Sequence, residues 1–192
     1  MKKQSLLFHV LFVAFFLSSA TRAYAQFNNA DDDADADAEY ATTLLKPGTA
    51  MPPFKTKTLD GKTFKSTQLK GKYVVLDFWA SWCPDCRKDI PNLLRIYDCF
   101  HGAGVEFVGI SLDTDRDAWS KAVSQYGIPY LQVGDLQKKD ESALARLFGV
   151  KWIPSLYLIN PKGQVVIATV LSDKIERYLY EVIDSTVNPD KK

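Results

Sequence analysis

Cysteine and histidine are scarce in this chain of 192 residues, which contains three cysteines and two histidines. A structural zinc site takes four ligands, mostly cysteine and histidine. Apart from His9 near the N-terminus, only Cys99, His101 and carboxylates could complete a site begun by Cys83 and Cys86. A small secreted scaffold held together by disulfides would need more cysteines, spread along the chain. The composition therefore argues against a metal site and against a disulfide framework.

Long basic runs and glycine-rich nucleotide loops are also absent. Lysine and arginine number 24 against 23 acidic residues, which gives a net charge of +1. Because a nucleic-acid-binding domain carries a strong basic patch or stripe, we expect no nucleic-acid partner. No GxGxxG or similar phosphate-binding motif occurs, so a nucleotide cofactor is not expected either.

The N-terminus has the layout of a secretory signal peptide. The basic start "MKK" precedes the apolar stretch "LLFHVLFVAFFL", and Ala23-Tyr24-Ala25 offers small residues for cleavage. The apolar stretch is short for a membrane span. We therefore expect residues 1–25 to be a cleaved signal peptide and the protein to be exported to the periplasm. A retained N-terminal membrane anchor is the alternative.

An acidic segment of low complexity follows the apolar stretch. The sequence "NNADDDADADAEYA" has few large apolar residues, and such a composition is typical of disordered chain. We predict a disordered acidic linker over residues 26–45, one folded domain over residues 46–187 and a short tail over residues 188–192.

Strand and helix patterns alternate along the predicted domain. "FKTKTLDGKTFKS" alternates around Asp60-Gly61, which is a strong hairpin signal. "YVVLDFW" is a continuous apolar run, typical of a strand buried on both faces, and apolar residues then recur at helical spacing from Pro84 to Phe100. This order predicts an α/β fold with parallel strands first and an antiparallel edge at the end. Further strands are predicted near residues 105–112, 128–135 and 153–171, and helices near 115–127, 140–149 and 172–187.

Two cysteines stand two residues apart where the buried strand gives way to the helix, in "DFWASWCPDCRKDIP". Cys83 falls at the helix N-terminus, where unpaired N–H groups and the helix dipole stabilise a thiolate. Cys86 lies one turn further in and should be more buried. The placement favours redox catalysis in which Cys83 attacks a substrate disulfide and Cys86 resolves the mixed disulfide. A purely structural disulfide would close too short a loop to add much stability, and a c-type haem attachment would need histidine in place of Arg87.

The motif and its flanks resemble a known family. "VVLDFWASWCPDC" resembles the active-site strand and turn of thioredoxin-like proteins, and "WCPDCRKDIPNL" resembles the exported thiol–disulfide oxidoreductases of the TlpA/ResA group, which includes members that serve cytochrome c maturation. The resemblance runs from about Lys46 to Val187 and includes a helix-and-strand insertion, about Asp115 to Val133, that plain thioredoxin lacks. It implies a thioredoxin-like fold, with a central mixed β-sheet flanked by helices and an N-terminal β-hairpin.

The resemblance also implies roles for residues around the cysteine pair. Asp77 matches the buried acid of thioredoxins, whose pKa burial should raise and which would exchange a proton with Cys86; an aspartate that reaches solvent at a strand edge is the alternative. Pro154 matches a cis-proline that leaves the backbone of Ile153 free to pair with a substrate peptide; a trans-proline that begins a strand is the alternative. Trp82 would form part of an apolar rim, or else pack in the core.

The residues between the sulfurs depart from the family pattern. Much of the TlpA/ResA group has proline directly before the second cysteine, whereas this chain has Pro84-Asp85. We expect both residues to contact substrate. The charge of Asp85 opposes thiolate formation and Arg87 partly offsets it, so the effect on the reduction potential has no predicted sign. Cys99 matches no family role. Because free cysteines are usually buried, we predict a buried structural thiol, with a regulatory or intermolecular disulfide as the alternative.

The sequence as a whole predicts an exported enzyme that reduces disulfides in other proteins, in cytochrome c maturation or in envelope redox homeostasis. A membrane-bound thiol reductant would supply its electrons, and the cysteine pair would be its only redox centre, without cofactor or metal. We expect a monomer that contacts the membrane only if the N-terminal segment is retained. An oxidant or isomerase with the same site and a non-catalytic peptide-binding module are the alternatives. A thiol peroxidase is disfavoured, because Ala80 and Leu76 stand where that class has Thr or Ser and Pro.

Overall fold

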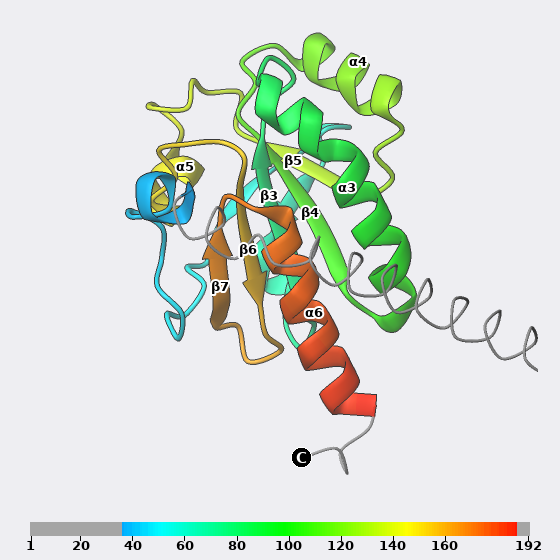
Figure 1. The fold of residues 1–192 in the computed structure, drawn as a ribbon. Helices are drawn as coiled ribbons and strands as arrows, with labels where there is room; N and C mark the ends of the chain where they lie inside the picture. The colour runs from blue at the N-terminus through cyan, green and yellow to red at the C-terminus, as the bar shows by residue number, and fades with distance from the viewer. Residues whose placement is uncertain (1–35, 188–192) are drawn as a thin grey trace, which may run out of the picture. The chain divides into compact units, whose positions relative to one another are not determined.

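A seven-stranded mixed β-sheet forms the centre of the protein, which is known from a computed structural model that describes residues 36–187 (Figure 1). The strand order is β2-β1-β5-β4-β3-β6-β7; β3, β4 and β5 run parallel, and the other pairings are antiparallel. The predicted mixed sheet and N-terminal hairpin are therefore confirmed. The strands are β1 (Lys55–Thr58), β2 (Thr63–Lys65), β3 (Val74–Trp79), β4 (Glu106–Ser111), β5 (Leu131–Gly134), β6 (Ser155–Ile159) and β7 (Val165–Thr169).

Helices flank the sheet, as predicted. The helices α3 and α6 pack against each other (Figure 1), and α4 with β5 forms the insertion predicted from the family resemblance. The bounds of the α-helices are α3 (Pro84–Phe100), α4 (Arg116–Tyr126), α5 (Ala143–Phe148) and α6 (Ser172–Val187), and two short 3-10 turns cover Ser66–Leu69 and His101–Ala103.

Capping residues explain where these helices begin and end. The Asp115 carboxylate accepts from two backbone N–H groups at the start of α4, and the Ser142 hydroxyl accepts from the N–H of Ala145 at the start of α5. Both helices end at a glycine in the left-handed region, Gly127 with φ 62° and Gly149 with φ 70°. Glycine adopts this conformation without the steric cost of a Cβ. The glycines in the sequence therefore predicted these ends correctly.

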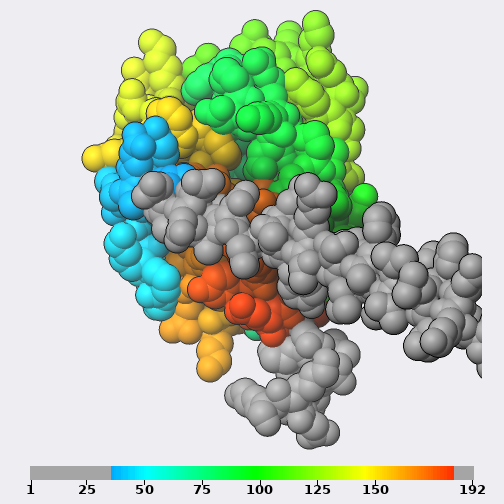
Figure 2. Space-filling view, viewed as in Figure 1, coloured from blue at the N-terminus to red at the C-terminus, as the bar shows by residue number. Residues whose placement is uncertain are grey.

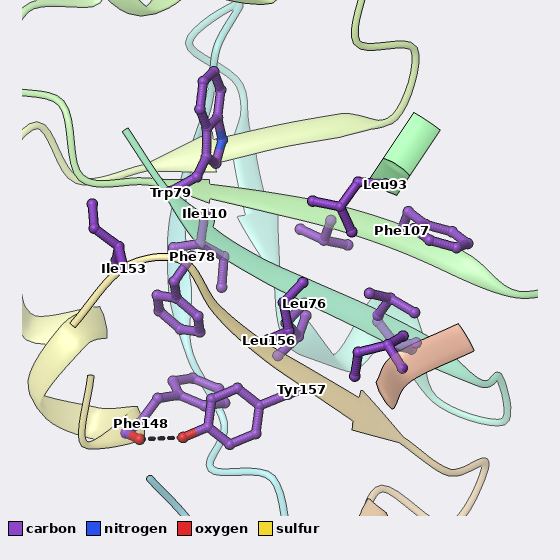
Figure 3. Packing of buried hydrophobic residues seen from close by; sticks show 14 of the residues in the cluster. Leu76, Phe78, Trp79, Leu93, Phe107, Ile110, Phe148, Ile153, Leu156 and Tyr157 are labelled. Carbon is purple, nitrogen blue, oxygen red and sulfur yellow. Dashed lines mark hydrogen bonds between the residues drawn. The ribbon is translucent and has the colours of Figure 1, made fainter. Parts of the chain in front are cut away.

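The central strand β3 is buried along its whole length and separates two sides of the core. Phe78 packs against Phe148 of α5 and against Tyr157, with ring centroids 5.2 and 6.0 Å apart. Trp79 points the other way (Figure 3). Because side chains alternate along a strand, Asp77 shares the face of Trp79, opposite to α5.

Residues 36–45, called the N-terminal segment below, belong to the folded domain. The prediction of a disordered linker is therefore wrong for this part. Residues 36–40 are helical, and Ala41 and Leu44 are buried in the core. The Thr43 hydroxyl donates to the carbonyl of Gly149 at the end of α5. In Figure 2 the N-terminal segment, in blue, lies at the surface beside the yellow residues around α5.

Asp37 shows why the acidic composition was misleading. Its carboxylate accepts hydrogen bonds from the Thr169 hydroxyl at 2.8 Å and from the backbone N–H of Val170 at 2.9 Å. It also pairs with Lys174 at 2.6 Å. The segment is held by specific partners that lie more than a hundred residues away, so its own composition carries no sign of them.

The predicted signal peptide (residues 1–25), the first part of the predicted linker (26–35) and the C-terminal tail (188–192) lie outside the described residues. Within residues 36–187, none of the helices combines the length and the apolar character that crossing a membrane requires.

Candidate active site

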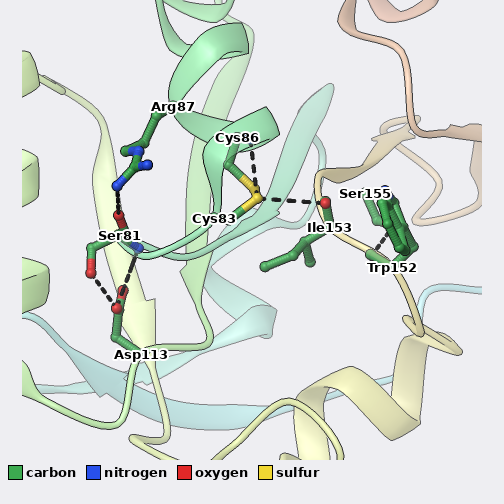
Figure 4. The surroundings of a disulfide bond; sticks show 8 residues. All are labelled: Ser81, Cys83, Cys86, Arg87, Asp113, Trp152, Ile153 and Ser155. Carbon is green, nitrogen blue, oxygen red and sulfur yellow. Dashed lines mark hydrogen bonds between the residues drawn. A yellow bond between two sulfur atoms is a disulfide. The ribbon is translucent and has the colours of Figure 1, made fainter.

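The cysteine pair lies where β3 leads into α3, as predicted (Figure 4). Cys83 is the N-cap residue of α3, Pro84 occupies the first helical position, and Cys86 lies in the first turn. The two cysteines form a disulfide, with their Cα atoms 5.3 Å apart. Cys83 Sγ accepts a hydrogen bond from the N–H of Cys86 at 3.1 Å. A backbone donor of the helix terminus therefore points at the sulfur that would carry the thiolate charge, which favours that charge.

Both cysteines are almost fully buried in this disulfide form. Cys83 is 3% exposed and Cys86 2% exposed, so the predicted difference in burial is nearly absent. One cause is the loop before β6, which approaches Cys83. Cys83 Sγ lies 3.6 Å from the carbonyl oxygen of Ile153 (Figure 4), and the peptide bond between Ile153 and Pro154 is cis. The predicted cis-proline is confirmed, and the sequence-distant loop indeed faces the pair.

An exposed surface surrounds the buried disulfide. Trp82 is 53% exposed, so the alternative that it packs in the core is wrong. Pro84 and Asp85 are also exposed on the first turn of α3. Trp152, which precedes Ile153, is 40% exposed and its carbonyl accepts from the Ser155 hydroxyl at 2.7 Å. The predicted binding residues therefore lie around the pair, while their role in binding stays a prediction.

Asp77 is buried beneath this surface. Burial and, to a lesser extent, the negative charge of Asp89 raise the pKa of its carboxyl to about 7, against the opposing effect of a hydrogen bond from Tyr130. Asp77 Oδ2 accepts from the Tyr130 hydroxyl at 3.2 Å, whereas Oδ1 is buried and has no hydrogen-bond partner among residues 36–187. The predicted rise in pKa is confirmed, and the alternative of a solvent-facing aspartate is wrong.

Asp113 holds the turn that leads into Cys83 and was missed in the sequence. Its buried carboxylate accepts from the backbone N–H of Ser81 at 3.0 Å, from the Ser81 hydroxyl at 2.6 Å and from the Ser111 hydroxyl at 2.8 Å. Arg87 donates to the Ser81 carbonyl at 3.3 Å (Figure 4). Because β3 and β4 are parallel, their carboxyl ends share one edge of the sheet. An aspartate just after the strand predicted near residues 105–112 was therefore an available signal.

Asp89 connects α3 to α6. Burial raises the pKa of its carboxyl, and Asp173 adds to the rise, while the Ser172 hydroxyl opposes it by donating to Oδ1 at 2.5 Å. The side-chain amide of Asn92 donates to the Ser172 hydroxyl at 2.7 Å. Ser172 thus forms part of a polar bridge between α3 and α6.

A pocket of about 450 Å³ opens beside the cysteine pair. The ring of Tyr40 stacks on Trp152 with centroids 4.4 Å apart and forms one wall. Sequence analysis missed Tyr40 because the residue falls in the segment that was predicted to be disordered. The pocket combines apolar side chains with acidic and basic ones. Its lining includes Tyr40, Asp85, Lys88, Asp89, Trp152, Pro154 and Asp173.

Cys99 is exposed near the end of α3, so the prediction of a buried thiol is wrong. The buried side of α3 is formed by Leu93, Ile96 and Phe100. Position 99 lies about 100° around the helix from Phe100, which turns Cys99 away from the core. The helical register contained this information, whereas the general tendency of cysteine to be buried did not.

The chain resembles known proteins in both sequence and structure. A sequence profile of the AhpC/TSA family matches residues 47–168. Thiol-disulfide oxidoreductase ResA from Bacillus subtilis is 32% identical over 122 residues, which cover 64% of this chain and 66% of that protein. ResA from Bacillus thuringiensis is 29% identical over 185 residues, 95% of this chain and 99% of that protein. The solved thioredoxin domain of a thiol-disulfide oxidoreductase from Bacteroides vulgatus has a TM-score of 0.66 and 29% identity, with coverage of 72% and 99%.

Proposed function

The chain belongs to the AhpC/TSA family and is a thiol–disulfide oxidoreductase with a thioredoxin-like fold, and on this premise we propose that it reduces disulfides in other exported proteins. One observation carries the proposal: the Cys83–Cys86 disulfide lies at the N-terminus of α3 and faces the backbone of the cis Ile153–Pro154 bond. In its reduced form this pair is a donor of two electrons, positioned beside a surface that a polypeptide can reach.

Cys83 begins the reaction in the reduced enzyme. Its thiolate attacks one sulfur of the substrate disulfide, the substrate S–S bond breaks, and a mixed disulfide forms between Cys83 and that sulfur. The other substrate sulfur leaves as a thiolate and takes up a proton. The backbone N–H of Cys86, which donates to Cys83 Sγ, stabilises the attacking thiolate.

Cys86 completes the reaction with the help of Asp77. The Asp77 carboxylate accepts the proton of the Cys86 thiol, and the resulting thiolate attacks Cys83 Sγ. The bond between Cys83 and the substrate breaks, and the second substrate sulfur leaves as a thiolate that is then protonated. The enzyme pair has become a disulfide and the substrate has gained two electrons. A carboxyl with a pKa of about 7 suits this role, because it accepts and releases a proton near neutral pH.

The substrate would lie along the exposed surface around the pair. An extended peptide can pair with the backbone of Ile153 by β-strand addition, while Trp82 and the first turn of α3, Pro84 and Asp85, contact its flanks. The exposure of Trp82 supports this arrangement.

The proposed site of action is the periplasm. The predicted signal peptide supports export, and the sequence resemblance to the TlpA/ResA group, which includes members that serve cytochrome c maturation, supports a role in the redox chemistry of the envelope. A membrane-bound thiol reductant would restore the dithiol, so the protein needs no bound cofactor, and it would act as a monomer. Mass analysis of the exported protein tests the predicted signal peptide, because cleavage after Ala25 leaves Gln26 as its first residue.

The reduction potential of the Cys83–Cys86 pair tests the direction of electron flow. A reductant should have a potential well below that of strong dithiol oxidants, which lie near −120 mV. Equilibration with glutathione buffers, followed by alkylation and mass analysis, measures the value. A potential near −120 mV would contradict the proposal and favour an oxidant or isomerase with the same site.

Cysteine variants separate catalysis from simple peptide binding. Cys83→Ala and Cys86→Ala should each abolish the reduction of insulin disulfides, and Cys99→Ser, which changes the exposed free thiol, should not. A Cys86→Ala, Cys99→Ser double variant should retain substrates as mixed disulfides on Cys83, without background from Cys99. Full cellular function of the Cys83→Ala protein would instead favour a binding module.

A further inference from the structure

Strand β4 separates the insertion strand β5 from the catalytic strand β3, and it carries a glycine at the point between them. Asp77 of β3 pairs with Gly109 of β4, and Gly109 pairs with Gln132 of β5. The three residues therefore form one row across the sheet. Because Gly109 has no side chain, side chains from the β5 side can pass over β4 and reach β3.

Two side chains from the β5 side reach β3, and that of Gln132 passes over Gly109. Gln132 Oε1 accepts from the indole N–H of Trp79 at 3.0 Å, and the Tyr130 hydroxyl donates to Asp77 Oδ2 at 3.2 Å. A Cβ atom at position 109 would lie 2.3 Å from Gln132 Nε2, so the opening is filled. The insertion thus contacts two alternate residues on one face of the catalytic strand.

We propose that Tyr130 is a positioning residue for the thiol–disulfide exchange, whose hydroxyl holds Oδ2 of Asp77 and leaves Oδ1 as the oxygen that exchanges the proton with Cys86. This inference rests on the proposed function. It assigns the two carboxylate oxygens different tasks. One accepts from a fixed donor, and the other, which is buried and without a hydrogen-bond partner in the part of the chain that the structure describes, stays available for the proton of the resolving thiol.

Packing fixes the donor independently of the reaction. Tyr130 is 6% exposed, and its ring lies 5.7 Å from that of Tyr97 and 5.9 Å from that of Phe107. Aromatic rings at these distances hold one another through edge and face contacts. The hydroxyl is therefore presented by a ring with little freedom to rotate away, which is the requirement for a positioning residue.

The groups that face Asp77 determine the sign of the effect. Asp89 on α3 raises the pKa of Asp77 by its charge, and Tyr130 lowers it by its hydrogen bond. The proton partner Cys86 also lies on α3, while the residues beside Asp77 in β4 and β6, Gly109 and Leu156, do not titrate. Loss of the tyrosine hydroxyl therefore removes a donor to the charged form.

The test substitutes Tyr130→Phe, which keeps the ring. Because a hydrogen bond to an ionised group is removed, the pKa of Asp77 should rise by about one unit, measured by carbon NMR of the Asp77 carboxyl in the disulfide form. Asp77 must be ionised to accept a proton, so the rate of resolution by Cys86 should reach its half-maximum at a pH higher by the same amount. Stopped-flow release of a substrate thiol from the mixed disulfide measures that rate.

Tyr97→Phe is the matched control, since it removes a hydroxyl from the ring packed against Tyr130. It should leave both the Asp77 titration and the pH profile where they are. An unchanged pKa of Asp77 in Tyr130→Phe, or an equal shift in Tyr97→Phe, would overturn the inference. In the wild-type protein the NMR chemical shift of the ring carbon bonded to the Tyr130 hydroxyl should change with the same pH midpoint as that of the Asp77 carboxyl. This measurement needs no variant, and different midpoints for the two carbons would also overturn the inference.

The titrations use the oxidised protein and need no catalysis. If the wild-type protein does not reduce insulin but Tyr130→Phe still raises the pKa of Asp77, the proposed function is wrong, while the hydrogen bond between Tyr130 and Asp77 is supported. If reduction is normal and the shift is missing, the function stands and the role of Tyr130 falls.

Discussion

At the scale of single residues, Asp77 is a titratable side chain that the fold removes from water. Its carboxyl lies in the core, with a pKa raised from 3.8 to about 7. The native state then binds a proton more tightly than the unfolded chain. The stability that this proton contributes is present below pH 3.8 and is lost as the pH rises towards 7.

Asp77→Asn should therefore change the pH dependence of stability. The variant has no charge to bury. Its unfolding free energy relative to that of the wild type should therefore increase as the pH rises from 4 to 9, by about 4 kcal/mol at most. Urea unfolding of both oxidised proteins across this range measures the difference. If the difference in unfolding free energy between the two proteins stayed constant with pH, the pKa of Asp77 would not be raised in the native state.

Some site residues could be predicted from the sequence because the pattern of residues next to them in the chain shows where they lie. Cys83 and Cys86 stand at a strand-to-helix junction, and Asp77 interrupts an apolar run, so their neighbours in the chain reveal their setting. Tyr130 and Asp113 contact the site from just outside two other strands. The place of Asp113 just after a predicted strand was an available signal, whereas nothing beside Tyr130 in the chain marks its contact with Asp77, because that contact depends on the order of strands in the sheet.

At the scale of secondary-structure elements, the insertion is part of the catalytic strand's environment. The sequence predicted a helix and a strand there, but the position of β5 between β1 and β4 depends on tertiary pairing that periodicity does not encode. The bounds of α3, in contrast, agreed with the prediction, since Pro84 fixes its start and the spacing of apolar residues covers its length.

Gly109→Ala should destabilise the protein by about 1–3 kcal/mol. The new Cβ would meet the Gln132 amide at 2.3 Å, and that amide cannot move without weakening its bonds to Trp79 and Trp119. Urea midpoints measure the cost. Gly102→Ala is the control, because a Cβ there has no atom within 4 Å and no positive φ to strain; equal losses in the two variants would contradict the account.

At the scale of the whole molecule, the N-terminal segment ties the start of the folded domain to its end. Asp37 contacts Thr169 at the end of β7 and Lys174 in α6, and Tyr40 stacks on Trp152 beside the active site. The α/β class followed from the periodicity of the elements, and the thioredoxin-like arrangement followed from the family resemblance. The segment did not, because its contacts are with the last third of the chain.

Asp37→Ala should lower the unfolding free energy by about 1–2 kcal/mol, since it removes the partly exposed, charged acceptor of three hydrogen-bond donors, Thr169, Val170 and Lys174. It should also weaken the stacking of Tyr40 on Trp152. Urea unfolding and tryptophan fluorescence measure the two effects. Thr42→Ala, at an exposed position of the same segment, should change neither, and a similar loss in this control would point to a general effect of altering the segment.

The row that crosses the sheet through Gly109 has a genetic consequence. The space above this glycine belongs to the side chain of Gln132, so the penalty of a methyl group at 109 depends on what stands at 132. In a Gln132→Ala background the same Gly109→Ala change should cost little. The two positions are therefore expected to show strong epistasis, and a lineage that lost the glutamine would be free to replace the glycine.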